Sequence, residues 1–421
     1  IGTSEGAKIE LSNIYFLSNS CRGNAVNSKS VIGCTKLSTT ALKACSDMLN
    51  SPFISNSSSL YGGYPIFEWQ STPYQFRGSG TKDNPYKIST KTDLEKMRDL
   101  INSNYYNQIY GKAYYIQMAD IDLEDELWIP IASYNSGQKF SGSYDGACHY
   151  IKGLNVSSFD EATGLFGVAD SATIHDVVVY GVINGSSKDS GGIIGIAQNG
   201  TGLKQCGFVG SVSSENNAGG LIGRIADSCT ITDCYHNGSV NSNENSGGIA
   251  GSITFDNEVE NAVVSIQNCY QANGIVSGNN SGCIVGNYTS KNNTSNTVSI
   301  LNCFATTDAD AATNLFGATK DNTLLVTKSM LKGASEDLGT FFMNNTTTLN
   351  NGYPVFKWQI KSNIEGDVNN DGVFNISDVI MFQKWLLCDG PLTTWKNGDL
   401  YNDDRIDAFD LCLIKQKIIY K

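Results

Sequence analysis

A glycine-rich unit that recurs at nearly constant spacing constrains the fold more than any other feature of this sequence. Its copies read TGLFG, GGIIG, GGLIG, GGIAG, SGCIVG and TNLFG, and they end at Gly167, Gly195, Gly223, Gly251, Gly286 and Gly317. The steps between them are 28, 28, 28, 35 and 31 residues. Short apolar runs between Gly and Asn turns at such a period are typical of stacked coils of β-strand, because a helical repeat would space its apolar residues by three and four.

A second signature runs in phase with the glycine unit and indicates which side chains face the interior of each coil. It reads IHDVVVYG, LKQCGFVG, ITDCYHNG, IQNCYQANG and ILNCF. Its central residues are small and soft and would stack into one inward ladder: Val177, Cys206, Cys234, Cys269 and Cys303. Valine shares this ladder with cysteine and the thiols show no C-x₂-C spacing, which favours core packing over disulfides or a metal site. We therefore expect a mainly β chain built on a right-handed parallel β-solenoid.

The sequence also carries a longer duplication. GGYPIFEWQ at 62–70 matches NGYPVFKWQ at 351–359, and the same shift of 289 residues aligns Leu42 with Leu331. Residues 40–70 therefore look like the closing segment of an earlier array, or else an N-terminal cap. The sequence is thus divided into 1–73 (closing segment or cap), 74–360 (solenoid) and 361–421 (tail).

Composition argues against several classes of function. The formal net charge is −12 and the pI is about 4.7, which argues against nucleic acid and against anionic membrane surfaces as partners. No stretch of about 18 apolar residues occurs, so we expect no transmembrane helix. The first residues, IGTSEGAKIE, lack the basic and apolar regions of a signal peptide.

The clearest chemistry lies in the stretch GDVNNDGVFNISD at 366–378. Calcium takes six to eight oxygen ligands, and a twelve-residue loop supplies them from positions 1, 3, 5, 7, 9 and 12 around a sharp turn at position 6. The turn falls on Gly372. The ligand positions hold Asp367, Asn369, Asp371, Val373 (through its carbonyl group), Asn375 and Asp378. This stretch therefore predicts a calcium loop.

A second copy, GDLYNDDRIDAFD, begins 32 residues later. Its corresponding positions hold Asp399, Tyr401, Asp403, Arg405, Asp407 and Asp410. Each loop leads into a helix with an apolar face, so the tail is expected to be a small all-α module with two loop–helix units and two calcium ions. Tyr401 stands at position 3 and Asp404 at the turn, so we expect a weaker second site with the Tyr401 side chain turned outward.

The repeats resemble the GLUG-motif family of bacterial surface proteins, whose name describes the glycine–apolar–glycine unit, over about residues 74–320. The residues ahead of them fit as well. FRGSGTKDNPYKIST leads into TDLEKMRDLIN, for which we expect a short helix with a capping box between Thr92 and Glu95. This resemblance specifies architecture and implies little about chemistry.

The tail, about residues 364–421, resembles a type I-like dockerin, the module that binds a cohesin on a cellulosomal scaffold. Asp in place of Glu at position 12 of both loops, and no long helix before the first loop, separate it from a full EF-hand pair. The resemblance implies cohesin contacts at loop positions 10 and 11 and further along each helix: Ile376, Ser377, Gln383, Lys384, Ala408, Phe409, Lys415 and Gln416. The two copies differ here, which argues against two equivalent binding orientations. Cys388 and Cys412 are expected to pack between the helices, with a bridge between them left open.

No catalytic centre is predicted. The three histidines are scattered, and the acidic candidates form no convergent set: Asp176, Asp189, Asp227 and Asp233. The resemblance implies a noncatalytic, secreted cellulosome component at the bacterial cell surface, whose dockerin binds a cohesin on a scaffoldin or anchoring protein. The solenoid would be a spacer, a dockerin-stabilising module or an adhesion arm. Two alternatives stay open, a polysaccharide-active enzyme delivered by the dockerin and a module that binds plant cell-wall polysaccharide.

Overall fold

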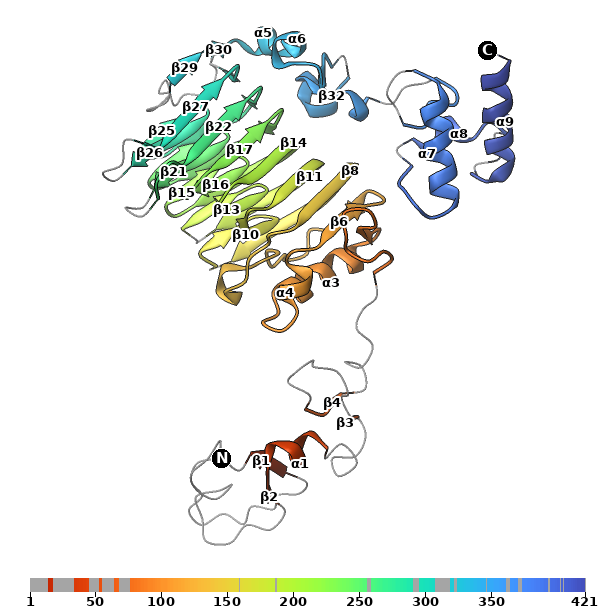
Figure 1. The fold of residues 1–421 in the computed structure, drawn as a ribbon. Helices are drawn as coiled ribbons and strands as arrows, with labels where there is room; N and C mark the ends of the chain where they lie inside the picture. Colours follow the sequence, from red (N-terminus) through yellow and green to blue (C-terminus); the bar gives the residue numbers. More distant parts are fainter. Residues whose placement is uncertain are drawn as a thin grey trace. The chain divides into compact units, whose positions relative to one another are not determined.

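The computed structural model divides the chain into two units, Ile1–Gln75 and Phe76–Lys421 (Figure 1). It describes residues 14–17, 34–44, 53–54, 64–67 and 76–421, and within the last range it leaves out 159, 186–187, 256–258, 291–294, 307–318, 322–323, 346, 361–363, 370–372, 393, 402, 404 and 421. None of the helices formed by these described residues is long and apolar enough to span a membrane.

The larger unit is built from parallel strands that stack coil upon coil, as the glycine repeat predicts (Figure 1). The coils contribute to three sheets, two of five strands and one of sixteen. The first five-stranded sheet contains β9 (Ala162–Thr163), β12 (Asp189–Gly191), β15 (Asn217–Gly219), β20 (Asn245–Gly247) and β25 (Asn280–Gly282). The second contains β10 (Phe166–Asp170), β13 (Ile194–Gln198), β16 (Ile222–Ile225), β21 (Ala250–Phe255) and β26 (Val285–Ser290).

The sixteen-stranded sheet carries the longest strands and bears one polar cluster described below. Its strands are β5 (Tyr86–Ile88), β6 (Tyr114–Gln117), β7 (Ile121–Asp122), β8 (Ser143–Ser158), β11 (Thr173–Gly185), β14 (Thr201–Ser214), β17 (Cys229–Thr232), β18 (Tyr235–Asn237), β19 (Val240–Ser242), β22 (Val263–Gln267), β23 (Tyr270–Ala272), β24 (Val276–Ser277), β27 (Thr297–Leu301), β28 (Phe304–Thr306), β29 (Thr319–Asp321) and β30 (Leu324–Val326). In the later coils three short strands take the place of one long strand, because β17, β18 and β19 all pair with β14.

The glycine unit lies where the chain passes from one five-stranded sheet to the other. A Cβ atom on Gly192 would collide with the ring of Phe208, and one on Gly220 would collide with the carbonyl oxygen of Gly248 in the next coil. The close approach of successive coils therefore requires glycine at this corner, which explains the recurrence of the unit.

The predicted inward ladder is present. Val177 pairs in register with Cys206, and the amide of Cys206 donates to the Sγ atom of Cys234 at 3.4 Å. All five ladder residues are fully buried, and the four cysteines are free thiols. Burial raises the pKa of the Cys234 thiol well above its ordinary value, so this thiol is held neutral. The ladder is core packing, as expected.

A second, polar ladder stabilises the first five-stranded sheet. The Nδ2 group of Asn217 donates to Asp189 at 2.6 Å, Asn245 donates to Asn217 at 2.7 Å, and Asn280 donates to Asn245 at 2.9 Å. The ladder begins at a carboxylate that also accepts from the Nε group of Arg224 at 2.9 Å. Each amide is thus satisfied by its neighbour one coil away, which ties the coils together in register.

The coils are covered on one side by a closing segment, residues 327–359. Its elements are α5 (Lys328–Lys332), α6 (Ser335–Leu338), β31 (Phe342–Met343), η4 (Leu349–Gly352), β32 (Val355–Phe356) and η5 (Lys357–Gln359). Its buried residues pack on aromatic side chains of successive coils, including Tyr235, Tyr270 and Phe304. The second copy of the motif GYP-x-F-x-W-Q therefore belongs to a segment that covers several coils.

Two helices and a short 3-10 turn lie near the start of the unit: α3 (Lys91–Ile101), α4 (Asn107–Tyr110) and η3 (Tyr134–Ser136). The expected capping box between Thr92 and Glu95 was wrong by two residues. The box joins Thr90 and Asp93: the Asp93 amide donates to the Thr90 hydroxyl at 3.2 Å, and the Thr90 amide donates to the Asp93 carboxylate at 2.9 Å. Thr92 therefore lies inside the helix.

The smaller unit contains five described elements: β1 (Ile14–Leu17), β2 (Cys34–Leu37), α1 (Thr39–Lys43), β3 (Phe53–Ile54) and β4 (Ile66–Phe67). The first two strands are parallel, and the last two are antiparallel.

The tail forms three helices: α7 (Ile376–Leu386), α8 (Trp395–Gly398) and α9 (Ala408–Ile419). Val379 and Phe382 from α7 meet Ile414 from α9 in one buried cluster, as the apolar periodicity predicts. Cys388 and Cys412 are both exposed free thiols, so the expectation that they pack between the helices was wrong. Cys388 follows the last turn of α7 with a positive φ of 56°, so it has already left the packed face.

Candidate calcium loops and partner-binding surface

In the first loop, Asp378 holds the two ends of the loop together. Asn375 caps helix α7, and its side chain accepts from the Ser377 amide at 2.8 Å. The Asp378 carboxylate accepts from the Asn375 amide at 2.8 Å and from the Asn369 amide at 3.1 Å. An Asn at the N-cap followed three residues later by Asp is a capping box, so the sequence fixes this geometry locally.

The second loop repeats these contacts. Asp407 accepts from the Phe409 amide at 2.6 Å, while Asp410 accepts from the Asp407 amide at 3.1 Å and from the Tyr401 amide at 3.0 Å. The N-cap dihedral angles agree as well, with φ −152° and ψ −170° at Asn375 and φ −149° and ψ −167° at Asp407. The two stretches are therefore one backbone device used twice.

The donor set fits calcium. Among the loop residues that the structure describes, four carboxylates are buried, those of Asp367, Asp378, Asp399 and Asp410. Taking an ionised carboxylate out of water is costly unless charge or hydrogen bonds compensate it, and a hard cation with oxygen ligands supplies such compensation. Of the other predicted ligand residues, Asn369 and Asn375 are half-buried, whereas Val373, Asp403, Arg405 and Asp407 are exposed, and Asp371 lies outside the described residues, as do Gly372 and Asp404.

Tyr401 differs from its counterpart in the first loop through its side chain. The ring is 62% exposed, and its centroid lies 5.8 Å from that of Phe409. Its backbone amide still binds Asp410, so the loop keeps its path while the side chain turns outward. This is the orientation that the sequence predicts for a tyrosine at position 3.

The residues carried over as cohesin contacts lie on α7 and α9. Ile376, Ser377, Lys384, Ala408, Phe409 and Gln416 are exposed, and Gln383 and Lys415 are half-buried. Sequence reasoning missed two further exposed apolar residues beside them, Val373 and Ile380. Ile380 follows Ile376 by four residues and so lies on the same outer face of the helix, a spacing that could have identified it.

A duplicated oxygen-rich loop, each copy followed by a helix with exposed apolar side chains, defines a calcium-loop module for binding another protein. Residues 365–419 match the type I dockerin domain model, and the C-terminal part of the chain is a type I dockerin. A dockerin implies a cohesin partner, and type I dockerins bind calcium.

Comparisons of the whole chain with curated proteins are less specific. Over 98 residues the chain is 33% identical to a candidate Gly-rich membrane protein of Evansella cellulosilytica, covering 22% of this chain and 10% of that protein. Over 96 residues it is 34% identical to Halomucin of Haloquadratum walsbyi, covering 22% of this chain and 1% of that protein. The chain thus spans a tenth or less of either relative.

A solved structure resembles the chain in fold. It is a Bacteroides ovatus protein described as a candidate immunoglobulin A1 protease, with a TM-score of 0.51 and 23% identity. The match covers 67% of this chain and 94% of that one. At this identity the likeness concerns the β-rich fold and carries no activity across.

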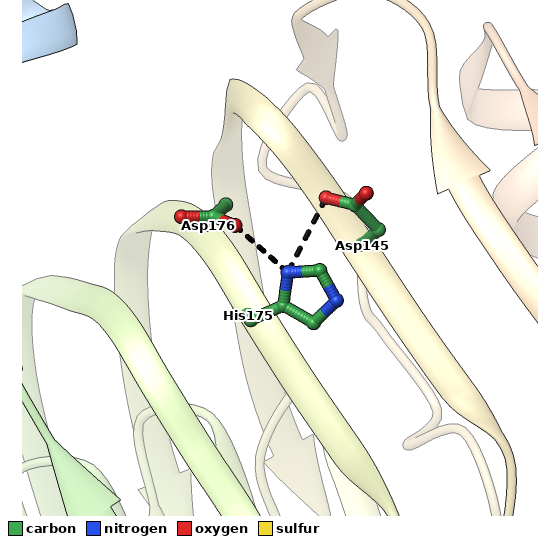
Figure 2. A group of neighbouring side chains, drawn as sticks. All are labelled: Asp145, His175 and Asp176. Carbon is green, nitrogen blue, oxygen red and sulfur yellow. Dashed lines mark hydrogen bonds and ion pairs between the residues drawn. The ribbon is translucent and has the colours of Figure 1, made fainter.

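The structure brings together a second polar cluster that the sequence analysis did not find. The Nδ1 atom of His175 lies 2.8 Å from a carboxylate oxygen of Asp176 and 3.5 Å from one of Asp145 (Figure 2). Asp145 belongs to β8, whereas His175 and Asp176 belong to the neighbouring strand β11. The ligand atoms of the three residues lie within 4.8 Å of one another, so the cluster could hold a cation.

Electrostatics in this cluster shift the pKa values of the histidine and of one carboxylate. Burial acts to lower the pKa of His175, but the hydrogen bond to Asp176 and the charge of Asp145 outweigh burial and raise it. For Asp145 burial raises the pKa and outweighs the charge of His175, which lowers it. The three groups therefore form an electrostatically coupled triad on two neighbouring strands.

Proposed function

We propose that this chain is a noncatalytic cellulosome component, secreted to the bacterial cell surface, where its dockerin binds a cohesin of a scaffoldin or anchoring protein. The observation that carries this proposal is the duplicated loop in which Asp378 and Asp410 tie calcium-type loops to α7 and α9. The solenoid then acts as a spacer, a dockerin-stabilising module or an adhesion arm.

Calcium would act by ordering the two helices. The carboxylates of Asp367, Asp378, Asp399 and Asp410 are buried and lose hydration when the loops close, so a bound cation stabilises the closed state. The helices share only a small apolar cluster, so bound calcium is expected to add to the stability of the closed loops and of the outer faces that the helices present.

The test is a calorimetric titration of the full chain against the host's cohesins, with calcium and with EDTA. We expect binding to one or more cohesins with calcium and no measurable heat with EDTA. Equal affinity under both conditions would contradict a calcium-dependent dockerin. The exposed carboxylate of Asp389, 68% accessible and outside both loops, offers a matched control as Asp389→Ala, which should bind like the wild type.

The two helices should not contribute equally to binding. Phe409 with Tyr401 forms an exposed aromatic pair at the start of α9, whereas the start of α7 presents Ile376 and Ser377. Exposed aromatic side chains are the usual anchors of protein interfaces. We therefore expect Phe409→Ala to weaken cohesin binding more than Ile376→Ala does, and the reverse order would place the main contact on α7.

A second candidate function rests on the triad in Figure 2. Asp176 also lines a hollow with Gln205, Phe341 and Trp358, so one carboxylate of the triad and aromatic rings line the same hollow. Such a combination suits a polysaccharide, either bound or cleaved. Reducing-sugar release from plant polysaccharides that is lost in Asp145→Asn and Asp176→Asn would support an enzyme, and glycan-array binding without product would support a binding module.

A further inference from the structure

The smaller unit repeats the end of the larger one, element by element. A shift of 289 residues carries the described elements of Ile1–Gln75 onto those that close the solenoid: β1 onto β28, β2 onto β30, α1 onto α5, β3 onto β31 and β4 onto β32. The sequence motif alone covers only the last part of this correspondence.

The pairing within these elements is conserved as well. Tyr15 pairs with Thr35 in β1 and β2, and the shifted residues Phe304 and Leu324 pair in β28 and β30. The antiparallel pair of Phe53 with Phe67 likewise corresponds to that of Phe342 with Phe356. Register is set by the whole fold of a segment, so agreement at both strand pairs is evidence of a common structure.

Two side-chain contacts agree too. The ammonium group of Lys43 lies 5.3 Å from the ring centroid of Tyr64, and that of Lys332 lies 5.3 Å from that of Tyr353. The helices begin in the same way, since the Ser38 hydroxyl accepts from the Ala41 amide at 3.2 Å and the Thr327 hydroxyl accepts from the Met330 amide at 3.3 Å.

In the larger unit the closing segment packs against strands from several coils. Tyr235 donates its hydroxyl to Gln359 at 3.2 Å, and Tyr270 accepts from Asn350 at 2.6 Å. With Val178 and Phe304 these residues supply the aromatic and apolar surface from four different strands, β11, β18, β23 and β28. Within the described part of the smaller unit, β1 supplies the only coil strand that corresponds to these four, with Tyr15 at the position of Phe304.

We propose that the elements between Ile14 and Phe67 are the last coil and closing segment of a second solenoid, and that their partner is a stack of parallel coils of the same class. The coils would pair with β1 as β23 pairs with β28, and would present aromatic residues to Phe53 and Tyr64. The chain would then belong to a tandem of lid-closed solenoids. This inference does not depend on the cohesin proposal.

The experiment exchanges the lids within the full chain. Residues 327–359 are replaced by a second copy of residues 38–70, which has the same length, and in a control chain by a Gly/Ser segment of that length. Hydrogen exchange of β18, β23 and β28 is measured in each. We expect the exchanged chain to retain wild-type protection and the Gly/Ser chain to exchange at least about tenfold faster. An exchanged chain that behaves like the Gly/Ser chain, or does not accumulate in folded form, would overturn the proposal.

A paired substitution tests whether the new lid makes the same contacts. Gln359→Ala in the wild type removes the acceptor for the Tyr235 hydroxyl and should speed exchange of β18, and Gln70→Ala in the exchanged chain should do the same. Lys357 and Glu68 stand two residues before Gln359 and Gln70 and serve as controls. Lys357 is exposed, so we expect Lys357→Ala in the wild type and Glu68→Ala in the exchanged chain to leave hydrogen exchange unchanged. Sensitivity to Glu68→Ala but not to Gln70→Ala would contradict a shared mode of packing. Cohesin binding is measured separately in every variant, and a change in it bears on the dockerin proposal and not on the packing of the lid.

Discussion

Replacing Asp378 by Ala should unfold the first loop–helix unit when calcium is absent. The carboxylate is fully buried and accepts from two backbone amides, Asn369 at 3.1 Å and Asn375 at 2.8 Å. A fully buried donor left without an acceptor costs about 1–3 kcal/mol, and since these two amides are only partly buried we expect about 1–3 kcal/mol for the pair. A module of roughly 55 residues has about 3–8 kcal/mol of stability in total, so the loss is a large fraction of the whole.

Hydrogen exchange of α7 in the presence of chelator measures this loss directly. We expect Asp378→Ala to bring exchange of α7 close to that of an unfolded chain, and Asp389→Ala to leave it as in the wild type. Added calcium should restore only part of the protection, because the substitution also removes the ligand at loop position 12. If α7 of Asp378→Ala is as well protected in chelator as α7 of the wild type, the argument that Asp378 holds the loop closed is refuted.

Three further predictions concern individual side chains. Tyr401→Asn should raise the calcium affinity of the second loop roughly tenfold, which corresponds to about 1.4 kcal/mol, and should lower the affinity for the cohesin. Calorimetric titration with calcium and with the cohesin measures the two affinities. Burial lowers the pKa of His236 from 6.5 to about 4, so only the unfolded chain takes up a proton between these values. Solenoid stability should therefore fall by up to about 3 kcal/mol as the pH drops through this window, and thermal unfolding of His236→Gln at pH 7 and pH 4.5 should show a smaller difference. Iodoacetamide should label Cys388 and Cys412 quickly, while the ladder residues Cys234 and Cys269 react only after unfolding, which peptide mass spectrometry resolves.

The parallel solenoid could be predicted because its coils repeat in the sequence. Alignment of LKQCGFVG with IHDVVVYG places Cys206 above Val177, and the paired strands β11 and β14 confirm that register. The capping box was placed on Thr92 instead of Thr90 because both threonines precede an acidic residue by three positions. Only the packing of the helix distinguishes the two, and a short sequence pattern does not contain that information.

The calcium loops could be predicted for a different reason, since all their ligands come from one local stretch. The triad of Asp145, His175 and Asp176 could not, because it joins two coils across an irregular register. In the register of β11 and β8, His175 pairs with Asp145 and the next pair is Val177 with His149. Residues 146–148 of β8 therefore lie opposite a single residue of β11, Asp176. Such a bulge re-aims side chains in a way that the repeat period does not reveal.

The two loops carry different residues at position 3 because the backbone and the side chain at this position have separate roles. In both loops the backbone amide at this position binds the aspartate at position 12, at 3.1 Å from Asn369 and 3.0 Å from Tyr401. The loop therefore closes whatever side chain the residue carries, so the side chain at position 3 can have a different role in each loop. In the first loop Asn369 is predicted to offer an oxygen to the cation, whereas in the second Tyr401 lies against Phe409 and enlarges an exposed aromatic surface. If this reasoning holds, Tyr401→Ala should leave the closure of α9 intact in hydrogen exchange yet weaken cohesin binding by about 1–2 kcal/mol. Loss of α9 protection in that variant would instead assign Tyr401 to the fold of the loop.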